Sequence, residues 1–462
     1  MSDIDFWDVI NRSENGPMIT ENEYDLSVYN TINEILKDHK IRYDPEIIIP
    51  DDNSLADDVW NAGLEAFLRI GVYNVSTRKL IKFTEEEVKS ELKNLSGEVE
   101  VGEGKDKVKV IKRNVEDNRA PVIESGPHGA ALDPTIHTKI LQVYAQEPGT
   151  HILGQIGRLD KIHGLTTREN SPVQILAATL FAKNARKVLE MVGRKGMAIH
   201  GGVSGGVSLL QDISADSEEA LRPSDIRSLF LYPEFKVDDI QLSKAAHWLL
   251  RGYRTIVGGS PMIGAWCGST EGTAIGCVIQ HLAAQLVYKG NFTMGGGNHI
   301  NYHTTTNIPA EWVSSVSHQA VARNSKIMGS GTCIRAAGKP DTEQLYYEIA
   351  AHSILNVVCG RSTLASPRTA FPLFLNHVSA LGTRLMVEIT PFATSLKRKE
   401  ANIFVKSLLS KYEDKIDIEK TDPGKPFEQI YDLETLQPKK ESLDKYDGVK
   451  KELEALGIEF KK

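Results

Sequence analysis

The sequence predicts an α/β fold, a (β/α)8 TIM barrel with an N-terminal α+β extension and a C-terminal helical tail. Eight short apolar segments lie between residues 121 and 365, and each precedes a longer stretch of helical periodicity. The segments are continuously apolar, which is typical of strands buried on both faces. Eight such units within about 260 residues fit a closed barrel better than an open sheet.

Length and composition agree with this prediction. The chain has 462 residues, a formal charge of −7 and ordinary glycine and proline contents, which excludes collagen-like and low-complexity classes. Its length would allow about three domains, but a barrel holds about 250 residues as one unit. Mixed charges with a negative balance argue against nucleic-acid binding.

Residues 1–118 form the predicted extension. Apolar positions over 57–68 have helical spacing, and Thr84 followed by three glutamates indicates a capped helix start. Residues 98–110 alternate around a glycine-containing turn, which predicts a β-hairpin.

Residues 119–395 form the predicted barrel, and 396–462 a helical cap with helices at 402–412 and 446–456. Helices between the strands are expected at 171–192, 239–252, 309–323 and 342–358. The eight strands are expected at residues 121–124, 151–154, 197–200, 228–231, 254–257, 292–295, 326–329 and 362–365.

The four cysteines do not form a disulfide framework, and no CxxC pair is present. The acidic N-terminus is unlike a signal peptide. Polar residues and glycines interrupt the most apolar stretch, residues 256–288, so we expect no transmembrane helix and a cytoplasmic location.

A barrel active site forms at the carboxyl ends of the strands. The residues that end or follow each predicted strand are therefore the site candidates. They are Glu124, Gln155, His200, Tyr232, Gly258 with Gly259, Asn298 with His299 and Asn301, Ser330 with Cys333, and Arg368.

His200 ends the third strand and opens a glycine-rich loop, residues 200–206. A histidine beside unhindered backbone can transfer protons at neutral pH, although a hydrogen-bonded structural histidine at the rim is the alternative. The loop could also bind phosphate, but no GxxxxGK[ST] pattern is present.

A second polar cluster, residues 298–303, follows strand six. If that strand continued, alternation would place His299, Asn301 and His303 on one side. With Cys333 or Cys267 they could bind zinc, although the spacing is not diagnostic.

Two glutamates have competing interpretations. Glu271 is expected in the first turn of a helix, where the helix dipole favours an acid without any catalytic role. Glu124 is either an incidental acid near a tight turn or a carboxylate at the mouth that meets a cationic substrate.

Several segments resemble the archaeal monomethylamine:corrinoid protein methyltransferases, in the same order along nearly the whole chain. They include WNAGLEAFLRIGVY (60–73), VGEGKD (101–106), SPVQILAA (171–178), GRKGM (193–197), GKPF (424–427) and YDGVKKELEALG (446–457). The resemblance implies a (β/α)8 barrel, a homo-oligomer (typically a hexamer), and methyl transfer from methylamine to the Co(I) of a separate corrinoid protein. No cofactor would be tightly bound by this chain.

The resemblance also shows where this chain departs from the family. The family's pyrrolysine position is occupied by His200, which lacks the electrophilic imine carbon. The family's acid near the end of strand five is replaced by Gly258 and Gly259. Its amide and tyrosine after strand seven correspond to Thr332 and Ile334.

Two explanations of His200 are open. It is encoded, in a pyrrolysine-free relative with another methyl donor such as a quaternary amine, or it stands at a recoded or substituted stop codon. The altered neighbours favour the first explanation.

The leading hypothesis is a methyltransferase that moves a methyl group from a methylated amine to the cobalt of a corrinoid protein. His200 would be its catalytic residue, orienting the substrate or acting as general acid. Glu124, Gln155, Asn298, His299, Asn301, Thr332 and Cys333 would bind the substrate. The alternatives are a zinc-dependent methyl or acyl transferase, and an inactive relative that still docks the corrinoid protein.

Overall fold

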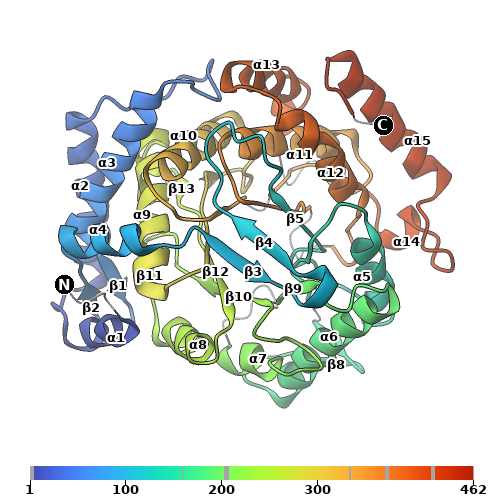
Figure 1. The fold of residues 1–462 in the computed structure, drawn as a ribbon, viewed down its shortest axis with the longest axis horizontal. Coiled ribbons are helices and arrows are strands. Elements are labelled where there is room, and N and C mark those ends of the chain that lie inside the picture. Colours follow the sequence, from blue (N-terminus) through green and yellow to red (C-terminus); the bar gives the residue numbers. More distant parts are fainter. Residues whose placement is uncertain are drawn as a thin grey trace.

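The computed structural model describes residues 5–158, 160–201, 208–331, 334–369, 374–417 and 422–460. Its centre is a closed parallel barrel with the strand order β10-β12-β14-β16-β17-β5-β6-β9, so the predicted TIM barrel is confirmed. The helices surround this barrel (Figure 1). The barrel strands are β5 (Val122–Ser125), β6 (Ile152–Leu153), β9 (Ala198–Gly201), β10 (Ile226–Phe230), β12 (Arg254–Gly258), β14 (Phe292–Met294), β16 (Gly329–Ser330) and β17 (Thr363–Ala365).

All eight predicted strands are present, with two shifts. The fourth strand begins at Ile226, two residues before the predicted start, and the seventh begins at Gly329, near the end of the predicted run. The helices around the barrel are α5 (His137–Gln146), α6 (Pro172–Met191), α7 (Leu209–Ser214), α8 (Asp239–Leu250), α9 (Thr270–Tyr288), α10 (Ile308–Asn324), α11 (Glu343–Val358) and α12 (Leu381–Ala393).

Helix α9 explains the apolar stretch in the middle of the sequence. Nearly every residue of α9 is buried, because it packs in one apolar core with helix α3 (Asn53–Ile70) of the N-terminal region. Gly63 of α3 lies so close to Val278 of α9 that a Cβ atom there would be 2.4 Å from the valine Cβ. Among the described residues, no helix is long and apolar enough to cross a membrane.

The N-terminal region packs on one side of the barrel. Two of its strands form a separate three-stranded sheet with a short strand that follows the fourth barrel strand. Strand β1 (Val72–Asn74) pairs with β2 (Lys79–Ile81) and also with β11 (Lys236–Val237), which follows the fourth barrel strand. The expected helix start at Thr84 is confirmed, since Thr84 and Glu87 form a capping box. The helices of this region are α1 (Phe6–Asn15), α2 (Glu21–Asp38), α3 and α4 (Glu85–Asn94).

The predicted β-hairpin is confirmed and closes the amino end of the barrel. Strands β3 (Glu98–Val101) and β4 (Val108–Ile111) lie across the barrel in the centre of Figure 1. Val101 and Val110 of the hairpin, both fully buried, form a core with the first inward-facing side chains of seven barrel strands. The barrel residues of that core are Val122, Ile152, Ala198, Ile226, Ile256, Phe292 and Met328.

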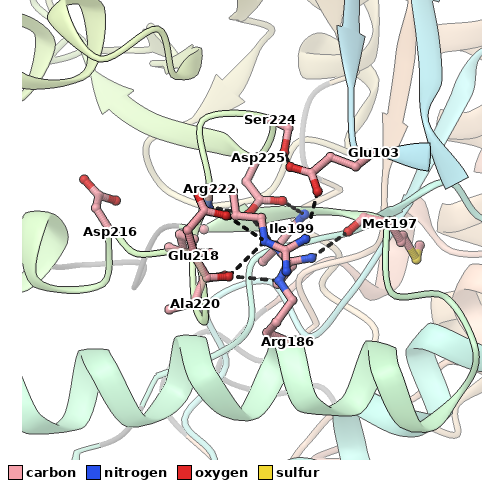
Figure 2. Close-up of polar contacts among 12 residues, drawn as sticks. Glu103, Arg186, Met197, Ile199, Asp216, Glu218, Ala220, Arg222, Ser224 and Asp225 are labelled. Atoms are coloured by element: carbon pink, nitrogen blue, oxygen red, sulfur yellow. Dashed lines mark hydrogen bonds and ion pairs between the residues drawn. The ribbon is translucent and has the colours of Figure 1, made fainter.

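A buried ion pair and the hairpin meet at this end (Figure 2). Arg186 of α6 pairs with Asp225 at 2.5 Å, and Asp225 also accepts hydrogen bonds from the backbone N–H groups of Ile199 and Arg222. Glu103 of the hairpin accepts from Ser224 and Arg222. The hairpin is therefore fixed to the barrel by polar contacts at its edge and apolar contacts at its centre.

The C-terminal segment packs on the side of α11 and α12. Its helices are α13 (Arg398–Leu409), α14 (Phe427–Ile430) and α15 (Lys440–Ala455), and both predicted tail helices begin earlier than expected. Tyr446 and Lys450 of α15 donate to Glu388 of α12.

Candidate active site

Three polar side chains from three strands meet inside the barrel. Paired residues of neighbouring parallel strands point to the same face of the sheet, and alternate residues share a face. Glu124 pairs with Ile152 and His200 pairs with Ile226, and both partners belong to the apolar core inside the barrel. Ser228 is two residues beyond Ile226, so it also faces the interior.

These three residues form a continuous hydrogen-bonded chain. The Nδ1 atom of His200 lies 2.6 Å from Oε1 of Glu124, and its Nε2 atom lies 2.7 Å from Oγ of Ser228. His128, in the loop after β5, places Nε2 3.5 Å from the same Glu124 oxygen. All four side chains are buried, so these contacts are shielded from bulk water.

The backbone around Glu124 is built to admit its carboxylate. A Cβ atom at Gly154 would lie 2.4 Å from Glu124 Oε1, so only glycine fits there. Gly126 is equally restricted, because its Cβ would lie 1.9 Å from the carbonyl oxygen of Gly154. The carboxylate is enclosed by backbone on one side and by two imidazole rings on another.

The local charges keep Glu124 ionised. Burial alone would raise its pKa, but the His200 and His128 rings, together with the His200 hydrogen bond, hold the pKa of Glu124 below its usual value. Burial lowers the pKa of His128 to about 4, so that ring is neutral at neutral pH. The site therefore holds one carboxylate whose principal partner is His200.

Gln155, a predicted site residue, lies beside this group. Its backbone N–H helps to hold the pKa of Glu124 down, and its side chain partly offsets the lowering of the pKa of His128 by burial. The first, second and third strand ends therefore do meet, as the barrel prediction required.

At the end of strand five, Gly259 makes room for a side chain from a helix. A Cβ atom at Gly259 would lie 2.0 Å from Nε2 of Gln280, which belongs to α9 and is fully buried. Neither amide atom of Gln280 has a hydrogen-bond partner in the described part of the chain. A buried amide of this kind is suited to bind a small polar ligand or a water molecule.

The cluster at residues 298–303 differs from the expectation. Strand six ends at Met294, and β15 (Asn298–His299) pairs instead with β13 (Met262–Ile263), outside the barrel sheet. The chain then turns, with His303 at a φ of 52°, so His299, Asn301 and His303 are not aligned along one strand face. The alternation was predicted only for a continuing strand, and strand six ends at Met294, before glycines 295–297, so that condition is not met.

The members of this cluster have different environments. Asn298 is buried, and its Oδ1 atom has no hydrogen-bond partner among the described residues. His299 is half-buried, burial lowers its pKa, and Asn301 is exposed. In the described part of the chain, no hydrogen bond joins them to the Glu124–His200–Ser228 chain, so their role in substrate binding stays a prediction.

Other candidates have structural roles or cannot be placed. Glu271 lies in the first turn of α9 and accepts from the backbone N–H of Tyr43, which supports its structural interpretation. Tyr232 donates to Asp238, and Ser330 accepts from Thr363. The backbone N–H of Arg368 donates to Ile334. Thr332, Cys333 and most of the glycine-rich loop after His200 lie outside the described residues.

The zinc hypothesis has little support within the described ranges. There, no group of three or more His, Cys, Asp or Glu side chains could hold a metal ion. Both ring nitrogens of His200 are already hydrogen-bonded, and Cys267 is buried in an apolar core that raises its thiol pKa.

Two residues of the site were missed by sequence reasoning. Ser228 is the first residue of the predicted fourth strand, whose candidate site residue is Tyr232, and His128 is not among the strand-end candidates. The only available signal was alternation, which places residues 226, 228 and 230 on one face once the true start of the strand is known.

The chain matches known proteins over its full length. The family model described as monomethylamine methyltransferase MtmB matches residues 4–458. Monomethylamine methyltransferase MtmB1 of Methanosarcina barkeri is 27% identical over 459 residues, covering 99% of this chain and 98% of the relative. MtmB2 of Methanosarcina acetivorans is 26% identical over 457 residues, with the same coverage.

Solved structures agree with the sequence comparison. The crystal structure of the Methanosarcina barkeri monomethylamine methyltransferase superposes with a TM-score of 0.95 and 25% identity, covering 99% of both chains. The crystal structure of the hydroxylamine MtmB complex matches equally well.

Proposed function

The chain belongs to the monomethylamine methyltransferase family, and from this premise we propose that it transfers a methyl group from a methylated amine to the Co(I) of a cognate corrinoid protein. The observation that carries the proposal is the buried Glu124–His200 pair at the carboxyl end of the barrel. By resemblance, His200 occupies the position that pyrrolysine has in the family.

The partner's corrinoid would supply the nucleophile, so this chain has two tasks. It must hold the amine in the barrel mouth, and for a neutral amine donor it must supply the proton that the departing nitrogen needs. A quaternary donor leaves as a neutral amine and needs no proton. The carboxylate of Glu124 fixes the orientation of the His200 ring through the hydrogen bond at Nδ1, as a carboxylate does for a catalytic histidine. No tightly bound cofactor of its own is required for either task.

The family resemblance also supports a homo-oligomeric enzyme, typically a hexamer, that docks the corrinoid protein at the barrel mouth. We include the homo-oligomer and its complex with the corrinoid protein in this proposal.

A methyl-transfer assay tests the function directly. Purified protein is mixed with reduced corrinoid protein and a panel of donors: mono-, di- and trimethylamine, tetramethylammonium and glycine betaine. Methylation of cobalt is followed by absorbance. We expect transfer from at least one donor, and a His200→Gln variant should reduce that rate at least 100-fold, the usual contribution of a general acid being roughly 10²–10⁴.

Failure of every donor to methylate cobalt, with a folded protein and a corrinoid partner shown to be active with a relative, would overturn the proposal. Transfer from the quaternary donors alone would identify the different methyl donor that the loss of pyrrolysine suggests.

A further inference from the structure

Ser228 is the member of the buried hydrogen-bonded chain that lies nearest the barrel mouth. The residue level with His200 on β10 is Ile226, and Ser228 is two residues closer to the carboxyl end on the same face. Ser228 is 6% exposed, against 1% for His200 and 3% for Glu124. Glu124 and His200 therefore lie deeper in the barrel, and the Ser228 hydroxyl lies nearest the mouth.

His200 cannot contact a substrate without losing a partner. An imidazole has two ring nitrogens, and here one is bonded to Glu124 and the other to Ser228. Glu124 is enclosed by the two histidine rings and by the backbone of Gly154. Within the described part of the chain, the hydrogen-bonded route from His200 Nε2 toward the mouth therefore leads through the Ser228 hydroxyl.

The Ser228 hydroxyl has the capacity for this role. A hydroxyl offers one donor and two acceptor positions. Within the described ranges, the contact with His200 is the one hydrogen bond that Ser228 Oγ makes. A further donor or acceptor position therefore remains for a nitrogen atom of a substrate.

We propose that Ser228 is a catalytic residue that carries the proton between His200 and the nitrogen of the methylated amine, an inference that rests on the proposed function. As the C–N bond of a neutral amine breaks, the methyl carbon bonds to the Co(I) of the partner's corrinoid, and the electron pair of the C–N bond stays on nitrogen. Oγ of Ser228 gives its proton to that nitrogen and takes the proton from Nε2 of His200. The ring is left neutral, with its Nδ1–H still bonded to Glu124.

The same geometry predicts a second property, which can be measured without methyl transfer. A serine, a histidine and a carboxylate joined at 2.7 Å and 2.6 Å are the arrangement that activates a serine hydroxyl as a nucleophile. Ser228 should therefore react with methanesulfonyl fluoride. The Oγ–S bond forms, the S–F bond breaks, fluoride leaves, and the hydroxyl proton passes to Nε2 of His200.

The first measurement compares methyl-transfer rates of wild type, Ser228→Ala and Ser228→Thr as a function of pH. The control is Ser125→Ala, which removes a buried hydroxyl on β5 that donates only to the carbonyl oxygen of Tyr144. We expect at least a 100-fold loss in Ser228→Ala, partial recovery in Ser228→Thr, and a rate within twofold of wild type in the control. The loss should be in kcat, with KM little changed.

The second measurement locates the sulfonyl adduct by peptide mass spectrometry and does not depend on methyl transfer. We expect an adduct on Ser228 in wild type and Ser125→Ala, no adduct at this position in Ser228→Ala, and at least tenfold less in a folded His200→Gln variant. Circular dichroism and thermal unfolding establish that each variant is folded.

The two readouts separate the two proposals. Labelling of Ser228 in a protein that methylates no cobalt would keep the activated hydroxyl and overturn the methyltransferase assignment. An active wild type with no adduct, in which Ser228→Ala retains its rate or only its KM changes, would overturn the role of Ser228 and keep the function. Absence of both activities would overturn both.

Discussion

The two ends of the barrel differ in how their interior is filled and in how their buried polar groups are paired. At the amino end, the β3–β4 hairpin fills the opening with Val101 and Val110, and the polar groups at its edge are paired. At the carboxyl end, the interior holds Glu124, His200 and Ser228, while nearby buried amides such as Gln280 and Asn298 have unpaired atoms among the described residues.

This difference indicates that the amino end contributes mainly to stability and the carboxyl end mainly to catalysis. Buried polar groups without partners cost free energy, so they persist mainly where a ligand or a reaction uses them. We therefore expect substitutions at the amino end to change the free energy of unfolding, and substitutions at the carboxyl end to change turnover.

The largest expected effect is a loss of methyl transfer in a variant at the carboxyl end. His200→Gln should lower the methyl-transfer rate by roughly 10²–10⁴ while costing at most about 1–2 kcal/mol of stability, because glutamine can keep one hydrogen bond. Stopped-flow kinetics and urea unfolding measure the two quantities. A variant that unfolds without a separate kinetic defect would remove the contrast.

The second test is Asp225→Ala at the amino end. It leaves the guanidinium of Arg186 buried without its carboxylate, which typically costs about 3–5 kcal/mol. Urea unfolding should show that loss, while kcat of the folded fraction stays within about twofold of wild type. A selective loss of kcat with unchanged stability would contradict the assignment of this end to stability.

The third test weakens the apolar plug. Val110→Ala removes two buried carbon atoms from the contact between the hairpin and the barrel, at a cost of about 2 kcal/mol. Hydrogen exchange should show faster opening of the amide groups of β3 and β4. Unchanged exchange would mean that the hairpin is held by its polar edge alone.

The last test concerns a dependence of stability on acid pH that originates near the mouth. Burial depresses the pKa of His128 in the folded state to about 4, so in the unfolded state the ring takes up its proton at higher pH. Stability should therefore fall as pH decreases from about 6.5 toward 4, by at most about 1.4 kcal/mol per pH unit for this ring. Unfolding of wild type and His128→Asn between pH 7 and 4.5 measures this, and equal slopes would exclude His128 as the source.

The candidate site was partly predictable. Glu124 and His200 were nominated because each ends a strand, and parallel strands bring their carboxyl ends together. Ser228 was not a candidate because the candidates lie at or after the predicted strand ends. Ser228 lies in the middle of β10 and contacts His200 from there. The alignment of His299, Asn301 and His303 required the sixth strand to continue, but that strand ends at Met294 and the chain turns after β15.

The sequence by itself predicted the eight buried strands, four of the helices between them, the hairpin and the resemblance to the family, because periodicity and residue type are local properties. Only the tertiary structure decided which side chains meet. Glu124 and His200 are 76 residues apart and His200 and Ser228 are 28 apart, and they touch because barrel closure and strand register bring their inward faces together. Register is set by the packing of the whole barrel, so no local pattern could fix it.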